Sequence, residues 1–249
     1  MLFRSLTDFK GDVVDMQWSP DGTRLALIVA DEDPANAGED EKDKTPPPIV
    51  IDRFYFKEDE TGYLGALRQH LYVLDLATRK AELLTPGNYD EALPAWSPDG
   101  REIAFVSNRN ADPDRSNEFG LYAIAARSGS TPRLLTKFQG EAGDSSWMSG
   151  PVWRPDGQQI AFVTDGDPKL IYYSLHRLAI VAASGGEHRV VTRELDRNVL
   201  QPRWAADGKS IYALVEDDRN QHLSKINVAT GRVEPIWRSE ERRVGKECR

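Results

Sequence analysis

Side chains that could perform hydrolytic chemistry are thinly spread along the 249 residues. A serine nucleophile is commonly placed on a sharp Gly-x-Ser-x-Gly turn and needs a histidine base and an orienting acid. The nearest match, Gly143-Asp144-Ser145-Ser146-Trp147, lacks the second glycine, and Ser184-Gly185-Gly186 has the composition of a hairpin turn. The sequence contains no complete nucleophile turn, so we assign no catalytic residue.

Metal-ligating side chains are equally scattered. The four histidines, His70, His176, His188 and His222, stand singly, and none has a second His or Cys at ligand spacing. Cys248 is the only cysteine, so no disulfide can form within the chain. We predict no metal site and no cofactor.

One pentapeptide recurs instead. Trp96-Ser-Pro-Asp-Gly100 combines a large aromatic residue with a tight corner. Proline fixes φ near about −65°, aspartate folds back onto nearby amides, and glycine accepts a positive φ. The pentapeptide occurs four times, in exact or partly altered form. The four copies share a tryptophan, an aspartate and a glycine: Trp18, Asp21, Gly22, Trp96, Asp99, Gly100, Trp153, Asp156, Gly157, Trp204, Asp207 and Gly208. The corner predicts a tight reversal between two strands. The short apolar run that follows each corner predicts the second of these strands.

Two further strand-like runs follow each apolar run, so the repeat predicts units of four strands. Four-stranded units repeated along a chain are typical of a β-propeller. We therefore expect an all-β protein of about four antiparallel blades, in an incomplete ring. The tryptophan of each unit should pack between neighbouring blades as part of the core.

Composition restricts the partners. A net charge of −8 argues against nucleic acid, and no apolar stretch is long enough to span a membrane. The start lacks the apolar segment of a secretion signal, which favours the cytoplasm. Phe3–Thr7 resembles the fourth strand of a blade, which indicates either that sequence is missing upstream or that this strand closes the ring on the last blade. Because the true start is in doubt, a periplasmic location stays open. The sequence does not indicate an oligomeric state.

The chain divides into a partial propeller, residues 1–237, and a tail, residues 238–249. The tail resembles the translation of a sequencing-library adapter and is expected to be non-native. Within the first blade, residues 31–70 form an insertion with an acidic run, Glu39–Lys44, that we expect to be a solvated loop without Ca²⁺-loop spacing. After Pro46–Pro48 comes Ile49–Lys57, an aromatic segment expected to form an extra hairpin over the propeller.

The repeats and the insertion together resemble known families. The Trp-Ser-Pro-Asp-Gly blades are similar to TolB-type propellers and to those of the prolyl oligopeptidase family of serine peptidases. The stretch Pro47–Lys80, with its Arg-Phe-Tyr-Phe-Lys run, resembles the acylaminoacyl-peptidase and dipeptidyl-peptidase branch. The resemblance implies an N-terminal propeller cap that admits short peptides, followed by an α/β-hydrolase domain that this chain does not contain.

The same resemblance suggests contact residues. Arg53, Phe54, Tyr55 and Phe56 are candidates for contact with a peptide or with the hydrolase domain; packing of the hairpin onto the first blade is equally plausible. Acids of such propellers can hold a substrate amino terminus, but for Asp90-Glu91 we favour an ordinary solvent-facing loop.

Two other functions remain as alternatives. One is a TolB-like binding propeller without enzyme activity, and the other is a WD-type scaffold. The blades lack the Gly-His and Trp-Asp ends of WD repeats, and the aromatic insertion favours the peptidase branch.

Overall fold

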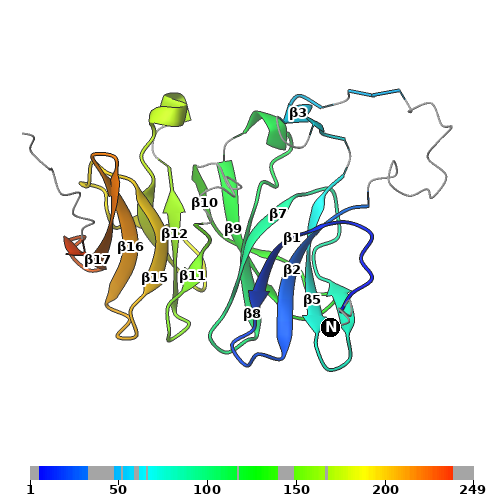
Figure 1. Ribbon diagram of the computed structural model, residues 1–249, viewed down its shortest axis with the longest axis horizontal. Helices are drawn as coiled ribbons and strands as arrows, with labels where there is room; N and C mark the ends of the chain where they lie inside the picture. Colours follow the sequence, from blue (N-terminus) through cyan, green and yellow to red (C-terminus); the bar gives the residue numbers. More distant parts are fainter. Residues whose placement is uncertain are drawn as a thin grey trace, which may run out of the picture.

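Four antiparallel sheets of four strands follow one another along the chain in the computed structural model. The described residues are 6–32, 48–51, 53–58, 62–65, 67–116, 118–139, 149–165 and 168–237. We call the sheets blades I to IV; they stand side by side from blade I at the right to blade IV at the left (Figure 1). The predicted four-strand repeat is confirmed. Predictions for residues 1–5, Glu39–Lys44, Ser145 and residues 238–249 lie outside the described residues.

The strands of each blade pair in sequence order. Blade I contains β1 (Val13–Trp18), β2 (Arg24–Ala30), β5 (Gln69–Asp75) and β6 (Lys80–Leu83). Blade II contains β7 (Glu91–Trp96), β8 (Glu102–Ser107), β9 (Glu118–Ala125) and β10 (Arg133–Gln139). Blade III contains β11 (Val152–Trp153), β12 (Gln159–Thr164), β13 (Arg177–Ala182) and β14 (Arg189–Val190). Blade IV contains β15 (Val199–Trp204), β16 (Ser210–Asp217), β17 (Asn220–Asn227) and β18 (Val233–Trp237).

The four corners that end in Asp-Gly join the first and second strands of the blades, as predicted. In blade I, Asp21 Oδ1 accepts hydrogen bonds from the Ser19 hydroxyl at 2.6 Å and the Thr23 amide at 3.1 Å. Gly22 has a φ of +69°, a conformation that glycine adopts without steric cost. The Ser19 hydroxyl and the Thr23 groups hold the pKa of Asp21 at about 2, so the corner is stabilised by a charged acceptor.

Apolar side chains fill the space between neighbouring blades. One cluster joins Ile28 and Leu71 of blade I to Ile103 and Phe105 of blade II. Similar clusters join blade II to blade III and blade III to blade IV. The second strands are continuous apolar runs because both of their faces are covered, and at each of the three junctions the facing sheets bury apolar side chains between them.

The tryptophans connect the first strands of successive blades by a repeated hydrogen bond. The indole Nε1 of Trp96 donates to the Gln17 carbonyl at 3.1 Å, and that of Trp153 donates to the Ala95 carbonyl at 3.0 Å. Trp204 donates to the Val152 carbonyl at 3.1 Å. Each acceptor immediately precedes the tryptophan of the preceding blade, so one contact recurs at all three junctions.

Trp18 departs from the prediction that all four tryptophans belong to the core. Its side chain is 61% exposed, whereas Trp96 is 8% and Trp153 is 9% exposed. Among the described residues no blade precedes blade I, so its first strand has no neighbouring sheet to cover it. The burial of this tryptophan depends on a neighbour rather than on its own sequence motif.

None of the helices in the described part of the chain is long and apolar enough to cross a membrane.

Candidate interaction site on the upper face

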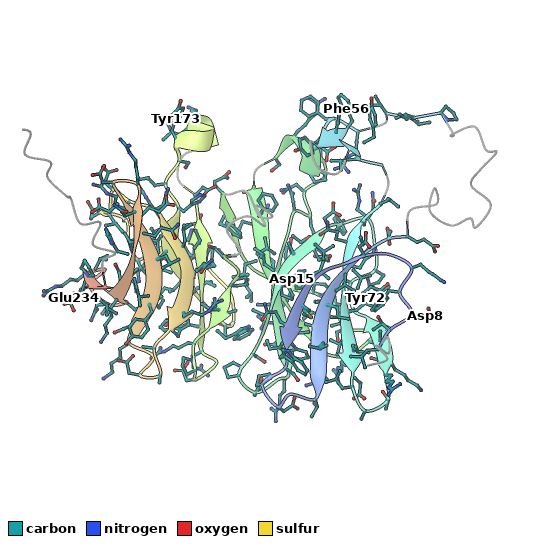
Figure 2. The ribbon with its side chains drawn as sticks, in the orientation of Figure 1. Asp8, Asp15, Phe56, Tyr72, Tyr173 and Glu234 are labelled. Carbon is teal, nitrogen blue, oxygen red and sulfur yellow. The ribbon has the colours of Figure 1, made fainter. Side chains whose placement is uncertain are left out.

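The loops between the second and third strands gather on one side of the blades, which we call the upper face. In Figure 1 it lies at the top, with β3 (Lys57–Glu58) of the insertion and the loops above β8 and β12. Phe56 and Tyr173 mark two points on it in Figure 2. The insertion forms a small hairpin, as predicted: β3 pairs with β4 (Gly62–Tyr63). Ile49–Ile51, also expected to be β-rich, forms no strand.

Arg53 ties the insertion to blade II. Its Nε and Nη2 donate to the two carboxylate oxygens of Asp114 at 3.0 and 2.5 Å. The backbone amide of Tyr55 donates to the same carboxylate at 3.1 Å. These donors, Arg53 first, lower the pKa of Asp114, so the acceptor stays ionised at neutral pH. The pair is a bidentate clamp between segments that are far apart in the sequence.

The aromatic residues of the insertion remain largely exposed. Phe54, Tyr55 and Phe56 are 63%, 50% and 40% exposed. The guanidinium carbon of Arg115 lies 4.4 Å from the ring centroid of Phe54, a cation–π contact. This end of the insertion therefore contacts the loop of blade II through Arg53, Phe54 and Tyr55, and its aromatic side chains keep much of their surface exposed.

The far end of the insertion is held against blade I. The Arg68 amide donates to Asp31 Oδ2 at 2.9 Å, and the Asp31 amide donates to the Arg68 carbonyl at 2.8 Å. His70 Nε2 lies 3.3 Å from Asp31 Oδ1, and its Nδ1 donates to the Thr85 carbonyl at 2.9 Å. The entry and exit of the insertion are thus fixed side by side.

Asp90 and Glu91 have different environments. The Asp90 side chain is 54% exposed and accepts from the Gln69 amide at 3.0 Å, in keeping with a surface loop. Glu91 is only 1% exposed, so the expectation of a solvent-facing acid is wrong for it. Its Oε1 accepts from Arg109 Nη2 at 2.5 Å. Pairing with an arginine makes this burial possible, since buried charges require partners.

The histidines do not come together. His176 contacts Asp165 through Nδ1, and His188 lies 3.1 Å from the Thr136 hydroxyl, at the junction of blades II and III. In the ranges described above, no group of three or more His, Cys, Asp or Glu side chains is arranged to hold a metal ion.

The sequence analysis did not identify three partners at this face: Asp114, which binds Arg53, Arg115, which contacts Phe54, and Arg109, which pairs with Glu91. Asp114 and Arg115 lie in a polar loop with no periodic pattern. The one feature of the sequence that indicates a special role for this loop is its length between two predicted strands of blade II. Nothing in the order of residues distinguishes the buried Glu91 from the exposed Asp90 beside it.

Comparison with known proteins finds relatives that match part of this chain. A dipeptidyl-peptidase 5 of Porphyromonas gingivalis is 30% identical over 148 residues, which are 57% of this chain and 20% of that protein. The chain thus matches about a fifth of that relative's length.

Solved structures share the fold. An acylaminoacyl peptidase of Pyrococcus horikoshii superposes with a TM-score of 0.61 at 17% identity, covering 92% of this chain and 32% of that one. TolB of Acinetobacter baumannii gives 0.58 at 16% identity, covering 94% and 45%. The TolB β-propeller domain family matches residues 63–242. With four blades built on one repeated corner and one repeated tryptophan contact, the chain belongs to the TolB β-propeller domain family.

Proposed function

We propose that this chain is the substrate-gating propeller portion of a serine peptidase that hydrolyses short peptides, of the dipeptidyl- or acylaminoacyl-peptidase type. The similarity to a dipeptidyl-peptidase 5 supports this proposal. The fold of an acylaminoacyl peptidase agrees with it. The catalytic serine, histidine and aspartate would come from an α/β-hydrolase domain outside these 249 residues.

The clamped insertion carries the proposal. Arg53 and Asp114 hold an aromatic segment across the upper face while Phe54, Tyr55 and Phe56 remain exposed. Fixed, exposed aromatic rings are suited to contact apolar parts of a peptide or of a second domain, because they bury much area at little cost in conformational entropy. In this proposal the upper face borders the path of the peptide, and the enzyme acts in the cytoplasm.

The gene itself provides the first test. Long-read sequencing of the source locus beyond the codon for Trp237 should show a frame that continues into a hydrolase domain with Gly-x-Ser-x-Gly, then Asp, then His. A frame that ends after the propeller contradicts the proposal.

The encoded full-length enzyme provides the second test. It should cleave dipeptidyl or N-acyl-aminoacyl p-nitroanilides. Arg53→Ala should raise KM or lower kcat by releasing the insertion. Arg127→Ala is the matched control, because this exposed arginine lies in the turn between β9 and β10, away from the insertion.

A TolB-like binding propeller without enzyme activity is the second candidate. It is favoured by the match to the TolB propeller family over residues 63–242 and by the shared fold with TolB. The same sequencing experiment separates the two candidates, because only the peptidase requires a hydrolase domain in the same frame.

A further inference from the structure

The upper end of blade II contains a buried polar cluster that the proposed function does not use. We define the Glu91 cluster as Glu91 at the start of β7, Ser107 at the end of β8, and Arg109 just after β8. Glu91 and Ser107 are direct cross-strand neighbours and are 1% and 2% exposed. Arg109 donates to Glu91 Oε1, and its guanidinium carbon lies 4.8 Å from the ring centroid of Tyr89 and 5.2 Å from that of Tyr122.

Each residue of the Glu91 cluster contributes one buried polar atom for which the structure shows no hydrogen bond. Glu91 Oε2, the Ser107 hydroxyl and Arg109 Nε are buried and have no hydrogen-bond partner. A buried carboxylate with one unpartnered oxygen is costly. A proton on Oε2 would turn that oxygen into a donor, for which the neighbouring Ser107 hydroxyl is a suitable acceptor. The Ser107 hydroxyl can serve the carboxyl group in either state, since it can donate to the carboxylate or accept from the acid, whereas Arg109 is the charged partner of the ionised state only.

The surroundings make both states accessible near neutral pH. Burial raises the pKa of Glu91 to about 7, against the opposing effect of Arg109. Of the groups on the surrounding elements, Asp90 raises the pKa of Glu91 further, whereas Ser107 lowers it. The other titratable or charged groups next to the cluster are Tyr89, Tyr122 and Lys137. On the blade I side, Asp90 pairs with Arg68, whose backbone amide binds Asp31, and Asp31 in turn pairs with His70.

Arg109 belongs to the loop that holds the insertion. The Asn108 side chain donates to the carbonyls of Pro113 and Ser116 at 3.0 and 2.8 Å, and so closes residues 108–116 into one unit. Asp114 of this loop clamps Arg53 and the Tyr55 amide. Glu91 is thus linked, through Arg109 and one compact loop, to the aromatic segment on the upper face.

We propose that the Glu91 cluster is a proton-operated brace for the insertion. The ionised carboxylate holds Arg109, which keeps residues 108–116 and the Arg53–Asp114 clamp in place. When Glu91 takes up a proton from solvent, Arg109 loses its charged partner and the insertion is held less firmly. This inference does not rest on the peptidase assignment, because its consequences appear in the 249-residue chain alone.

Hydrogen exchange of the Tyr55 amide tests the brace directly, because that amide donates to Asp114. Exchange is followed by NMR between pH 5.5 and 8.5 and corrected for the intrinsic rate at each pH. In the wild type, protection of Tyr55 should fall about tenfold from pH 8 to pH 6, the effect of weakening one charge-assisted contact. Glu91→Gln should show the low protection at every pH.

The matched control is Glu102→Gln. Glu102 lies at the opposite end of β8 and pairs with Arg133 at 2.9 Å, away from the insertion, so this variant should behave as the wild type. A wild-type protection factor that does not change with pH overturns the proposal, as does a Glu91→Gln protein protected like the wild type at pH 8. If Glu91→Gln fails to fold, the ¹³C titration of the Glu91 carboxyl in the wild type decides: a midpoint near 7 supports the brace, and one in the ordinary range of glutamate overturns it.

Discussion

The indole N–H of Trp153 donates to the carbonyl of Ala95, 3.0 Å away on the first strand of the neighbouring blade. The two residues are 58 positions apart in sequence, and the bond joins blade III to blade II. The repeated unit of a tryptophan followed by an Asp-Gly corner therefore has two separate structural roles. Its corner turns the chain within a blade, and its tryptophan attaches the blade to the preceding one.

Trp153→Phe should destabilise the protein by about 2 kcal/mol, because it removes the inter-blade hydrogen bond and part of the buried ring. Trp153→Ala should cost about 3–5 kcal/mol, since it also leaves a cavity. Urea unfolding followed by circular dichroism measures both changes. Trp18→Phe is the control: its ring is 61% exposed, and it should change the free energy of unfolding by less than about 0.5 kcal/mol. Equal effects at Trp18 and Trp153 would show that the inter-blade contact contributes nothing.

The corner aspartate of blade I should titrate far below its usual range. The Ser19 hydroxyl is the largest cause of the lowered pKa of Asp21, which is about 2. A carboxyl whose pKa is depressed by folding contributes stability above its unfolded pKa, and that stability is lost as the pH falls toward the folded pKa. Loss should therefore occur between about pH 4 and pH 2.

The variant Ser19→Ala tests the cause. It should raise the pKa of Asp21 toward the ordinary value while leaving the Thr23 contacts in place, and ¹³C NMR of the carboxyl group measures this. An unchanged midpoint in Ser19→Ala would assign the shift to Thr23 instead.

Asp114→Asn should loosen the insertion without unfolding the blades. The substitution removes the charge that accepts from Arg53 and leaves a weaker, neutral acceptor. Chymotrypsin should then cleave after Phe54, Tyr55 or Phe56 about tenfold faster than in the wild type, which corresponds to the loss of one charge-assisted hydrogen bond.

A neighbouring acid provides the control for this cleavage. Asp112 pairs with Arg115 at the surface of the same loop, with both side chains more than half exposed. Asp112→Asn should leave the cleavage rate near that of the wild type, because exposed pairs contribute little. If the two variants are cleaved equally fast, the Arg53–Asp114 clamp does not hold the insertion.

The blades could be predicted because their signals are local and repeated. Pro98, Asp99 and Gly100 dictate a corner by their own backbone preferences, and the apolar run that follows requires a covered strand. The same reasoning placed the first strand of each blade directly before its corner. Trp18 shows the limit: its motif matches that of Trp96, but burial requires a sheet on the other side.

The site could be predicted only in part. The sequence singled out Arg53 and its aromatic neighbours as unusual, yet the partner, Asp114, lies 61 residues away in a loop without a pattern. Such pairings depend on how two loops meet across blades, which no local preference encodes. The burial of Glu91 runs against the usual exposure of acids, so a rule based on residue type necessarily misplaced it.

Glu91 should make the protein less stable as the pH rises through the neutral range. Its pKa is raised to about 7 in the folded state from the ordinary value of 4.5, so the folded protein binds the proton more tightly than the unfolded chain. Between these two values the folded state carries more protons, and the free energy of unfolding must decrease with increasing pH. The decrease due to this group is at most about 3 kcal/mol between pH 4.5 and pH 7.

Glu91→Gln should remove this slope, because glutamine does not titrate and buries no charge. Urea unfolding at a series of pH values measures the slope, with Glu102→Gln as the control that keeps it. Protonation of Glu91 has opposite effects on the blade and on the loop above it. It removes a buried charge, which stabilises the blade, and it weakens the contact with Arg109, which loosens the loop. A variant that keeps the wild-type slope would mean that Glu91 is ionised throughout this range and that Arg109 fully offsets its burial.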